Sequence, residues 1–291
     1  MSKRVEKQIM GKIGINYYNY AGMGCEDYLC LLKETGFDSI FTGHFTMDEG
    51  EEKSIEKIVK AARRLNLEVE STHAPFDGIN AIWEKTDKAQ AMLGRLKKCV
   101  DECAENGIPV AVIHLSSGND APCVNEAGRA NIEKLVDYSL KKGVKLAFEN
   151  LRNIANLTFV MEQYKNEKQI GFCWDTGHEN CFTQGIEFMP LFGTKLLCTH
   201  IHDNMGIKDQ DMHLIPFDGN INFDRASELL SIYAEDITTT LEVFPESYKE
   251  AHYRYKGLSI NEFYTRAYNA ALKIQQKKEE YLHKCNYSGR R

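Results

Sequence analysis

The feature that most constrains the fold is a short apolar run that occurs eight times along the chain. Amphipathic helical stretches precede most of these runs, often with a Gly or polar break between the two. Such alternation is typical of βαβ units and of a parallel sheet. Eight units in a chain of 291 residues predict a closed (β/α)8 TIM barrel rather than an open doubly wound sheet. The apolar runs are residues 13–17, 38–41, 67–71, 109–113, 144–148, 170–174, 196–199 and 237–241.

No Pro/Ser-rich linker or low-complexity tract divides the sequence. We therefore expect a single domain over residues 1–291, with the barrel at about 11–280 and a short C-terminal tail. The first run leads into Tyr17-Tyr18-Asn19-Tyr20 and not into a glycine-rich turn, so the chain has no dinucleotide-binding fingerprint. Helices are expected near residues 26–34, 54–65, 83–106, 125–141 and 259–279.

Composition and charge narrow the range of partners and compartments. The net charge is -6 and the Lys and Arg residues are dispersed, which argues against nucleic-acid binding. No apolar run approaches the roughly 20 residues that a membrane span needs, and the N-terminal residues do not resemble a secretory signal. Nine dispersed cysteines suit reduced thiols. We expect a cytoplasmic protein without a membrane or nucleic-acid partner.

Residue types that bind metals follow six consecutive apolar runs, from the third to the eighth. Because the C-terminal ends of barrel strands converge on one face, we expect these side chains to lie close together there. Carboxylates and imidazoles in one place suit a divalent cation such as Mn, Zn, Fe or Co. The sequence therefore predicts a metal-dependent enzyme. The residues are His73, His114, Glu149, Asp175 with His178, His200 with His202 and Asp203, and Glu242.

Each of these residues also has a simpler explanation. A single histidine at a strand end is more often a hydrogen-bonded polar residue than a ligand. Glu149 and Asp175 could each cap the helix that follows, and Asp175-Thr176 is especially open to that interpretation. Accidental capping on six consecutive strands is a poor explanation, so the joint pattern favours a metal site.

Five segments resemble the xylose-isomerase-like barrel superfamily, and the resemblance extends over residues 13–242. That superfamily contains sugar and sugar-phosphate isomerases and epimerases, and also the endonuclease IV family. The resemblance implies a carbohydrate substrate and one divalent ion, Mn, Co, Mg or Zn. The segments are STHAPF, AFENL, CWDTGH, HIHDN followed by DMHLIPFDGNINF, and TLEVF.

The resemblance also implies roles for individual residues. Glu149, Asp175, His200 and Glu242 match the four metal ligands of the epimerase branch. His200 is preferred to His202 because the ligand of the family stands three residues before the acidic position, here Asp203. Glu149 and Glu242 would also act as the acid/base pair, and His178 would contact substrate oxygens.

The implied reaction is proton transfer through a metal-stabilised enediolate. A metal that bridges a carbonyl and a hydroxyl oxygen stabilises the charge left when the neighbouring proton is removed. One carboxylate removes the proton and the other returns it, which epimerises or isomerises the sugar. The sequence has no glycine-rich phosphate loop, which favours an unphosphorylated substrate.

Two positions depart from the ketose epimerases of this superfamily. Ala155 stands where those enzymes often have a glutamate, six residues after Glu149. The arginine that they carry after the seventh strand has no clear match, although Lys208 is nearby. These differences put ketose epimerisation itself in doubt.

Two alternatives stay open. An endonuclease IV-like phosphodiesterase with further Zn ions would fit nine residue types, but the chain lacks the Gly-rich extension of that family after Glu149-Asn150. A metal-dependent lyase, dehydratase or hydrolase acting on a modified sugar would use the same ligands. The nine residues are His73, His114, Glu149, Asp175, His178, His200, Asp211, His213 and Glu242.

Further residues are expected at the mouth of the barrel. Residues 203–222 are predicted to form a loop over the site. Trp83 could contact a sugar or could equally pack in the barrel. The C-terminal helix could form a homo-oligomer contact. The expected substrate-binding residues are Asn16, His73, Trp83, His114, His178, Asp211 and His213.

Overall fold

The computed structural model describes residues 11–18, 22–43, 54–246 and 249–287. Eight parallel strands form one sheet in the order β7-β6-β5-β4-β3-β2-β1-β8. Each strand coincides with one of the predicted apolar runs, so the predicted (β/α)8 barrel is confirmed. The strands are β1 (Ile13–Asn16), β2 (Ser39–Gly43), β3 (Glu68–His73), β4 (Val110–Ile113), β5 (Lys145–Glu149), β6 (Ile170–Asp175), β7 (Leu196–His200) and β8 (Thr239–Leu241).

The barrel is nearly closed at the seam between β7 and β8. Among the described residues, one isolated bridge joins Ile201 to Leu241 across this seam. The hydroxyl of Thr199 donates to Thr238 O at 3.0 Å and accepts from Thr240 N at 3.1 Å. A side chain thus replaces part of the backbone ladder, which explains why the pairing of β7 with β8 is short.

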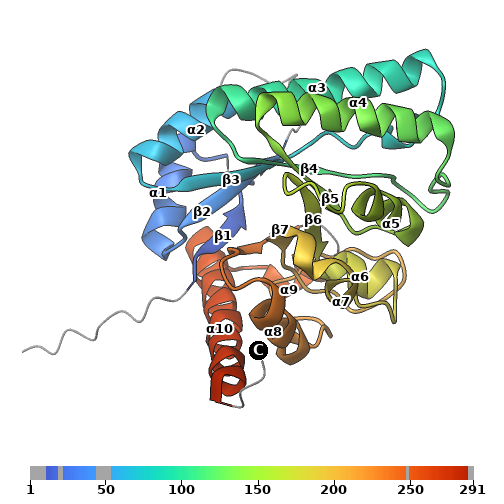
Figure 1. Cartoon of the computed structure of the whole chain (residues 1–291). Coiled ribbons are helices and arrows are strands. Elements are labelled where there is room, and N and C mark those ends of the chain that lie inside the picture. The colour runs from blue at the N-terminus through green and yellow to red at the C-terminus, as the bar shows by residue number, and fades with distance from the viewer. Residues whose placement is uncertain (1–10, 19–21, 44–53, 247–248, 288–291) are drawn as a thin grey trace, which may run out of the picture.

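Helices surround the strands (Figure 1). Helix α10 packs against both α1 and α8, so the last helix completes the outer ring beside the first. No helix in the described part of the chain has the length and apolarity to cross a membrane. The helices are α1 (Cys25–Thr35), α2 (Ile55–Arg64), η2 (Ile79–Trp83), α3 (Asp87–Asn106), α4 (Glu126–Lys142), α5 (Ile154–Gln163), α6 (Thr176–Phe182), α7 (Met189–Phe192), η3 (Gly193–Lys195), α8 (Phe223–Tyr233), α9 (Lys249–Tyr255) and α10 (Ile260–Tyr287).

Capping residues explain where the helices begin and end. The hydroxyl of Thr86 accepts a hydrogen bond from Ala89 N, so α3 begins at Asp87 and not at the predicted residue 83. Gly107 and Gly143 have φ angles of 62° and 71°, which end α3 and α4 and turn the chain into the next strand. Helix α10 continues to Tyr287, beyond the predicted end at residue 279.

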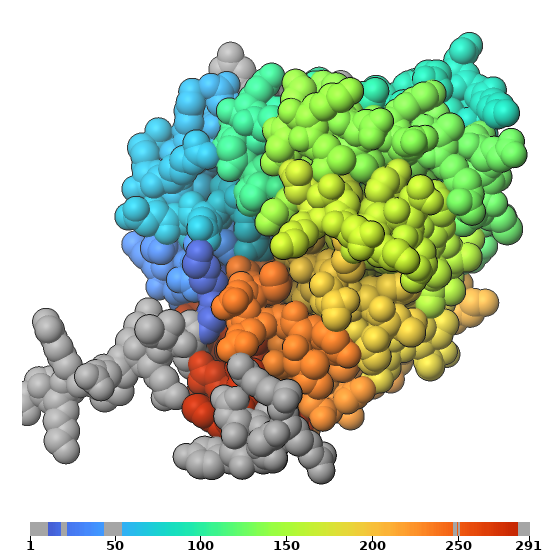
Figure 2. Space-filling view, viewed as in Figure 1, coloured from blue at the N-terminus to red at the C-terminus, as the bar shows by residue number. Residues whose placement is uncertain are grey.

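The main hydrophobic core lies between the strands and the surrounding helices, and its large members include Trp174, Phe148 and Phe172. A separate cluster of small residues comprises Val110, Val112, Ala147, Cys173 and Cys198. The space-filling view shows helices and loops closely packed over this side of the molecule, with residues from both ends of the described chain in contact (Figure 2).

Candidate metal centre

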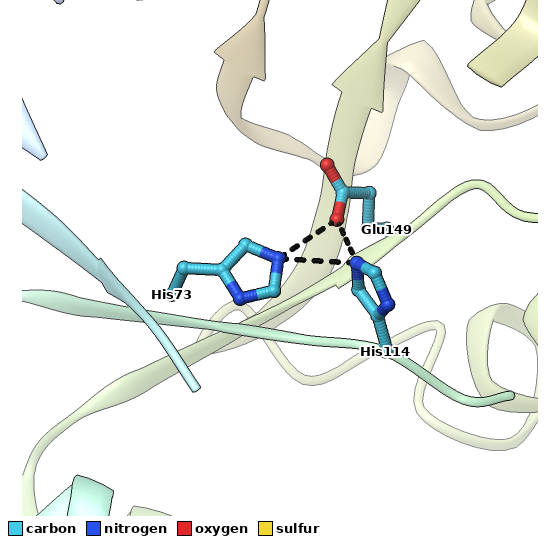
Figure 3. Close-up of side chains that lie close together, drawn as sticks. All are labelled: His73, His114 and Glu149. Atoms are coloured by element: carbon cyan, nitrogen blue, oxygen red, sulfur yellow. Dashed lines mark hydrogen bonds and ion pairs between the residues drawn. The ribbon is translucent and has the colours of Figure 1, made fainter. Parts of the chain in front are cut away.

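Glu149, the last residue of β5, lies at the centre of the site and is 1% exposed. Its Oε2 lies 2.6 Å from His114 Nε2 and 3.3 Å from His73 Nε2, and the two histidine nitrogens are 3.1 Å apart (Figure 3). Burial lowers the pKa of His114 and so favours the neutral imidazole, which donates to the carboxylate in its Nε2–H tautomer. Three neighbouring strands thus orient one carboxylate oxygen.

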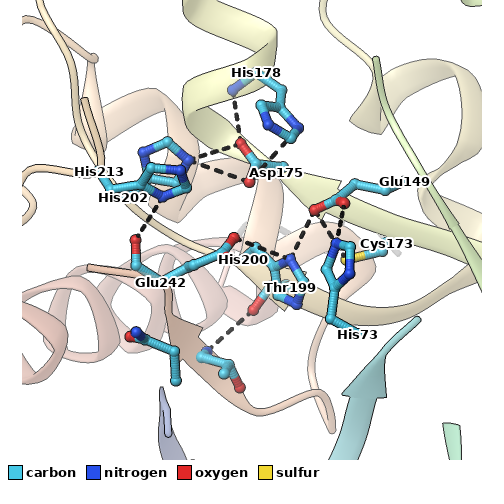
Figure 4. Close-up of polar contacts among 12 residues, drawn as sticks. His73, Glu149, Cys173, Asp175, His178, Thr199, His200, His202, His213 and Glu242 are labelled. Atoms are coloured by element: carbon cyan, nitrogen blue, oxygen red, sulfur yellow. Dashed lines mark hydrogen bonds and ion pairs between the residues drawn. The ribbon is translucent and has the colours of Figure 1, made fainter. Parts of the chain in front are cut away.

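The other oxygen of Glu149 faces His200, the last residue of β7 (Figure 4). His200 Nδ1 lies 2.7 Å from Glu149 Oε1 and 3.2 Å from Glu242 Oε2. Burial opposes charge on the imidazole, but the two carboxylates outweigh it and hold the pKa of His200 well above its usual range. Burial likewise opposes ionisation of Glu242, yet His200 lowers the pKa of this glutamate to about 2.

Asp175 ends β6 and has two roles. Its Oδ1 accepts a hydrogen bond from His178 N at 2.6 Å, so it does cap α6, as the simpler explanation proposed. The same carboxylate lies 3.0 Å from His202 Nε2. The capping role of Asp175 therefore does not prevent its carboxylate from binding a metal ion. Four residues present ligand atoms within 4.8 Å of one another, and these are Glu149, Asp175, His200 and Glu242.

This group of four fits a divalent cation. Three carboxylates and one imidazole form the mixed oxygen and nitrogen set that suits Mn, Mg, Co or Zn. Without a cation, the carboxylates depend on a charged His200 to offset their mutual repulsion. In addition, His200 Nε2 is buried without a hydrogen-bond partner among the described residues.

The segment of residues 203–222 carries two more site residues over the barrel. Asp211 Oδ2 lies 3.1 Å from His178 Nε2 and 3.0 Å from His213 Nε2. Burial opposes protonation of both imidazoles, but Asp175 and Asp211 raise the pKa of His178 to about 10, and Asp211 raises that of His213 to about 9. The predicted loop thus meets the strand ends directly.

Asp203 fixes this loop in place. Its carboxylate accepts hydrogen bonds from the backbone N–H groups of Asn204, Gly219 and Ile221, at 2.9, 2.8 and 3.1 Å. Its backbone pairs with Leu214 in both directions at 2.8 Å. Among non-glycine loop residues, Asp209, His213 and Phe217 have positive φ angles of 63°, 47° and 73°, a strained geometry that the surrounding contacts must hold.

A family model described as a xylose isomerase-like TIM barrel matches residues 29–259. The chain belongs to the xylose isomerase-like TIM barrel family. The predicted resemblance to this superfamily is therefore confirmed.

Individual relatives agree with this fold. An uncharacterized protein, y4fM, from Sinorhizobium fredii is 26% identical, and the match covers 87% of this chain and 89% of the relative. An L-ribulose 3-epimerase structure has a TM-score of 0.74 at 17% identity and covers 97% of this chain and 99% of its own. A structure of the IOLI protein with a binding zinc atom has a TM-score of 0.71 at 18% identity, with coverage of 92% and 99%. A D-psicose 3-epimerase from Clostridium cellulolyticum H10, solved with D-tagatose, has a TM-score of 0.70 at 14% identity, with coverage of 93% and 99%.

A cavity of about 340 Å³ in this xylose isomerase-like barrel lies away from the ligand cluster, beside α6 and α8. It contains Glu179, whose Oε2 accepts hydrogen bonds from Trp174 Nε1 at 2.8 Å and Phe188 N at 2.9 Å. Burial raises the pKa of Glu179 to about 7. A smaller cavity of about 240 Å³ is lined by Glu149 and Glu242 of the ligand cluster, and we regard it as the candidate site because His73, His114 and His178 line it as well.

Of the residues predicted to bind substrate, five line the cavity of the ligand cluster and two do not. Trp83 is buried behind it and donates from Nε1 to Leu115 O at 2.6 Å. The side chain of Asn16 forms two hydrogen bonds with the backbone of Val243: Oδ1 accepts from Val243 N at 3.0 Å and Nδ2 donates to Val243 O at 3.2 Å. Asn16 therefore positions the residue after Glu242. The five that line the cavity are His73, His114, His178, Asp211 and His213.

The sequence interpretation placed His202 among the metal-binding residue types but preferred His200 as the ligand, and it missed Phe182 and Arg152. His202 is fully buried, contacts Asp175 and stacks on His213 with ring centroids 4.1 Å apart. Phe182 and Arg152 line the cavity, whereas Lys208 is exposed outside it. The His200-x-His202 spacing was the one available signal for His202, since it places two imidazoles at neighbouring positions of one strand end.

Proposed function

We propose that this barrel is a divalent-metal-dependent sugar isomerase or epimerase that moves a proton on a carbon next to a carbonyl group. One observation carries the proposal: Glu149 and Glu242 approach the same nitrogen, His200 Nδ1, from different strands. Two carboxylates that converge on one point from separate strands can divide the work of removing a proton and returning it.

Glu149, Asp175, His200 and Glu242 would hold the cation, which would supply electrostatic stabilisation for negative charge on substrate oxygens. Burial opposes ionisation of Glu149, but His200, His114 and His73 hold its pKa well below the usual range. Glu149 and Glu242 are therefore both ionised and able to accept a proton. His73 and His114 fix one oxygen of Glu149, which orients the carboxylate towards the cavity.

The names of the structurally similar proteins support a small carbohydrate as the substrate. Two of them are named as sugar 3-epimerases, and a third holds a zinc atom. The cavity of about 240 Å³ suits a small ligand. Ala155 is exposed at the start of α5 and brings no carboxylate to the cavity, so the proposal stops short of ketose 3-epimerisation.

The test is incorporation of solvent deuterium into carbon-bound positions of ketoses, followed by NMR with the full chain and Mn²⁺. Glu149→Gln and Glu242→Gln should each slow the exchange by about 100-fold or more. Glu179→Gln is the matched control, because it removes a buried carboxylate outside the ligand cluster and should leave the exchange unchanged. Absence of exchange, or equal exchange in all four proteins, would contradict the proposal.

A second candidate is a multi-zinc phosphodiesterase, favoured by two further groups of potential ligands beside the first. His73, His114 and Glu149 form one group, and His202, Asp211 and His213 form the other. Cleavage of DNA containing an abasic site, dependent on added Zn²⁺, would support this candidate. The net charge of -6 argues against it.

A further inference from the structure

Arg152 stands three residues after Glu149 and lines the same cavity. It is the one Lys or Arg among the described residues that line this cavity. We propose that Arg152 binds an acidic group of the substrate, a phosphate or a carboxylate, in the cavity that Glu149 and Glu242 also line. The inference rests on the proposed function and narrows its substrate class to an anionic sugar.

Two contacts hold the guanidinium in place. Its Cζ lies 3.5 Å from the centroid of the Phe182 ring, which itself stacks on His178 at 4.7 Å. Its Nε donates to Asp209 Oδ1 at 2.8 Å. These contacts use the face and Nε of the group, and Nη1 and Nη2 make no hydrogen bond to the described residues. A planar pair of donors at a fixed position is what two-point recognition of a carboxylate or phosphate requires.

The neighbouring wall of the cavity supplies more donors. Ser116 and Ser117 line it, and their hydroxyls have no hydrogen-bond partner within the described residues. The side chain of Asn80 fixes this wall, since it accepts from Ser117 N at 2.8 Å and donates to Ser117 O at 2.9 Å. Hydroxyl and guanidinium donors together suit a group that has only acceptors.

The other charged side chains of the cavity bear on where an acidic group can lie. Glu149, Glu242 and Asp211 line the cavity too and would repel an acidic group, whereas Arg152 would attract it. The Arg152 and Asp209 side chains are 22% and 28% exposed, so water screens this pair only partly. The carboxylate of a sugar acid and the phosphate of a sugar phosphate could both accept hydrogen bonds from these donors. Neither would require a glycine-rich phosphate loop.

The test is a calorimetric titration in which the full chain, loaded with Mn²⁺, is titrated separately with D-fructose, D-fructose 6-phosphate and D-fructuronate. One of the two acids should bind at least about 10-fold more tightly than fructose, and which one does so identifies the acidic group. Arg152→Gln should remove this preference and leave the fructose affinity within about 2-fold, because only the charge-assisted hydrogen bonds are lost.

Two control variants separate binding from a purely structural role. Asp209→Asn removes the carboxylate charge that pairs with Arg152 but keeps an oxygen acceptor for Arg152 Nε, so the affinity for the acid should be retained or should rise. Arg129→Gln removes an exposed arginine that lies 4.3 Å over Phe159 outside the cavity, and it should change nothing.

The inference is overturned if no sugar binds, if neutral and acidic sugars bind equally, or if Arg152→Gln and Asp209→Asn weaken all three sugars alike. Binding and deuterium exchange are separate readouts. A preference for acids without exchange would refute the proposed function and leave the role of Arg152 intact.

Discussion

His200 and Glu149 form a buried pair in which Nδ1 of the imidazole lies 2.7 Å from Oε1 of the carboxylate. Both side chains are 1% exposed, and Glu242 shares the same imidazole nitrogen at 3.2 Å. A cation bound by both carboxylates would take the place of the proton on His200, so metal binding should release a proton and stabilise the fold.

The first prediction concerns metal removal. At a Mn²⁺ concentration of about 100 times Kd, binding should stabilise the folded chain by about 3 kcal/mol and raise Tm by several degrees. EDTA should reverse this shift, and Glu242→Gln should abolish most of it. Scanning calorimetry with and without EDTA measures the effect. An unchanged Tm on addition of Mn²⁺ or EDTA would argue that this site binds no such ion.

The second prediction concerns the loop of residues 203–222. Asp203→Ala removes the acceptor for three backbone N–H groups, and we expect a loss of about 2 kcal/mol in the free energy of unfolding. Amide hydrogen exchange of the loop should accelerate, while exchange in α3 should not change. Asp224→Ala, at an exposed position of α8, is the control and should leave the loop protected. Equal protection in both variants would show that Asp203 does not hold the loop.

The third prediction concerns Gly177, at the start of α6. A Cβ there would lie 1.8 Å from His202 Cε1, so the imidazole would have to leave its contact with Asp175. We expect Gly177→Ala to cost about 2 kcal/mol in urea unfolding and to weaken metal binding. Gly94→Ala provides the contrast, since open space surrounds this position in α3 and the substitution should stabilise the chain by about 0.5–1 kcal/mol. The explanation fails if both variants unfold at the same urea concentration.

The fourth prediction is a pH dependence of stability. Lys278 lies on α10 and is 2% exposed. Its Nζ donates to Ala234 O at 2.5 Å and to Glu235 O at 3.1 Å, just after the end of α8. Burial lowers the pKa of Lys278 from 10.5 to about 8. Between these two values the unfolded chain binds more protons than the folded chain, so this lysine makes stability rise with pH.

The measurement for Lys278 compares variants from pH 7.5 to 10.5. The free energy of unfolding of the wild type minus that of Lys278→Met should increase by up to about 3 kcal/mol over this range. Lys277→Met is the control, because the pairing of Lys277 with Asp224 raises its pKa instead, and no such increase is expected. A flat difference for Lys278→Met would show that this lysine keeps its proton.

Much of the barrel could be predicted because each strand is a short run that is buried, while α1 to α4 show one polar face. Helices α5 to α9 were not among the predicted helices. For α6 and α7, seven and four residues are too short for a helical period to appear. Helix α6 also begins inside the Asp-Thr-Gly-His motif. The predicted helix began too early, at residue 83, because the apolar residues of the preceding 3-10 turn η2 have a pattern that also suits an α-helix.

The convergence of Glu149, Asp175, His200 and Glu242 could be predicted because strand order alone brings strand ends together. The surroundings of the cluster could not, because they depend on how α6 and the loop of residues 203–222 pack. Arg152 reaches the cavity through contacts with Phe182 and Asp209, which lie on those two segments. Asn16 and Trp83, which were predicted to bind substrate, instead form hydrogen bonds with backbone groups of Val243 and Leu115. Residue type alone does not distinguish these two roles.

The most direct test of the account is the metal content per chain of protein purified without chelator, measured by elemental analysis for the wild type, Glu149→Gln and Glu179→Gln. The account predicts about one Mn, Co, Mg or Zn ion in the wild type and in Glu179→Gln, and almost none in Glu149→Gln, because Glu149 alone of these two carboxylates belongs to the ligand cluster. Two or three zinc ions per chain, with losses on His73→Ala and on Asp211→Asn, would contradict it and favour the phosphodiesterase.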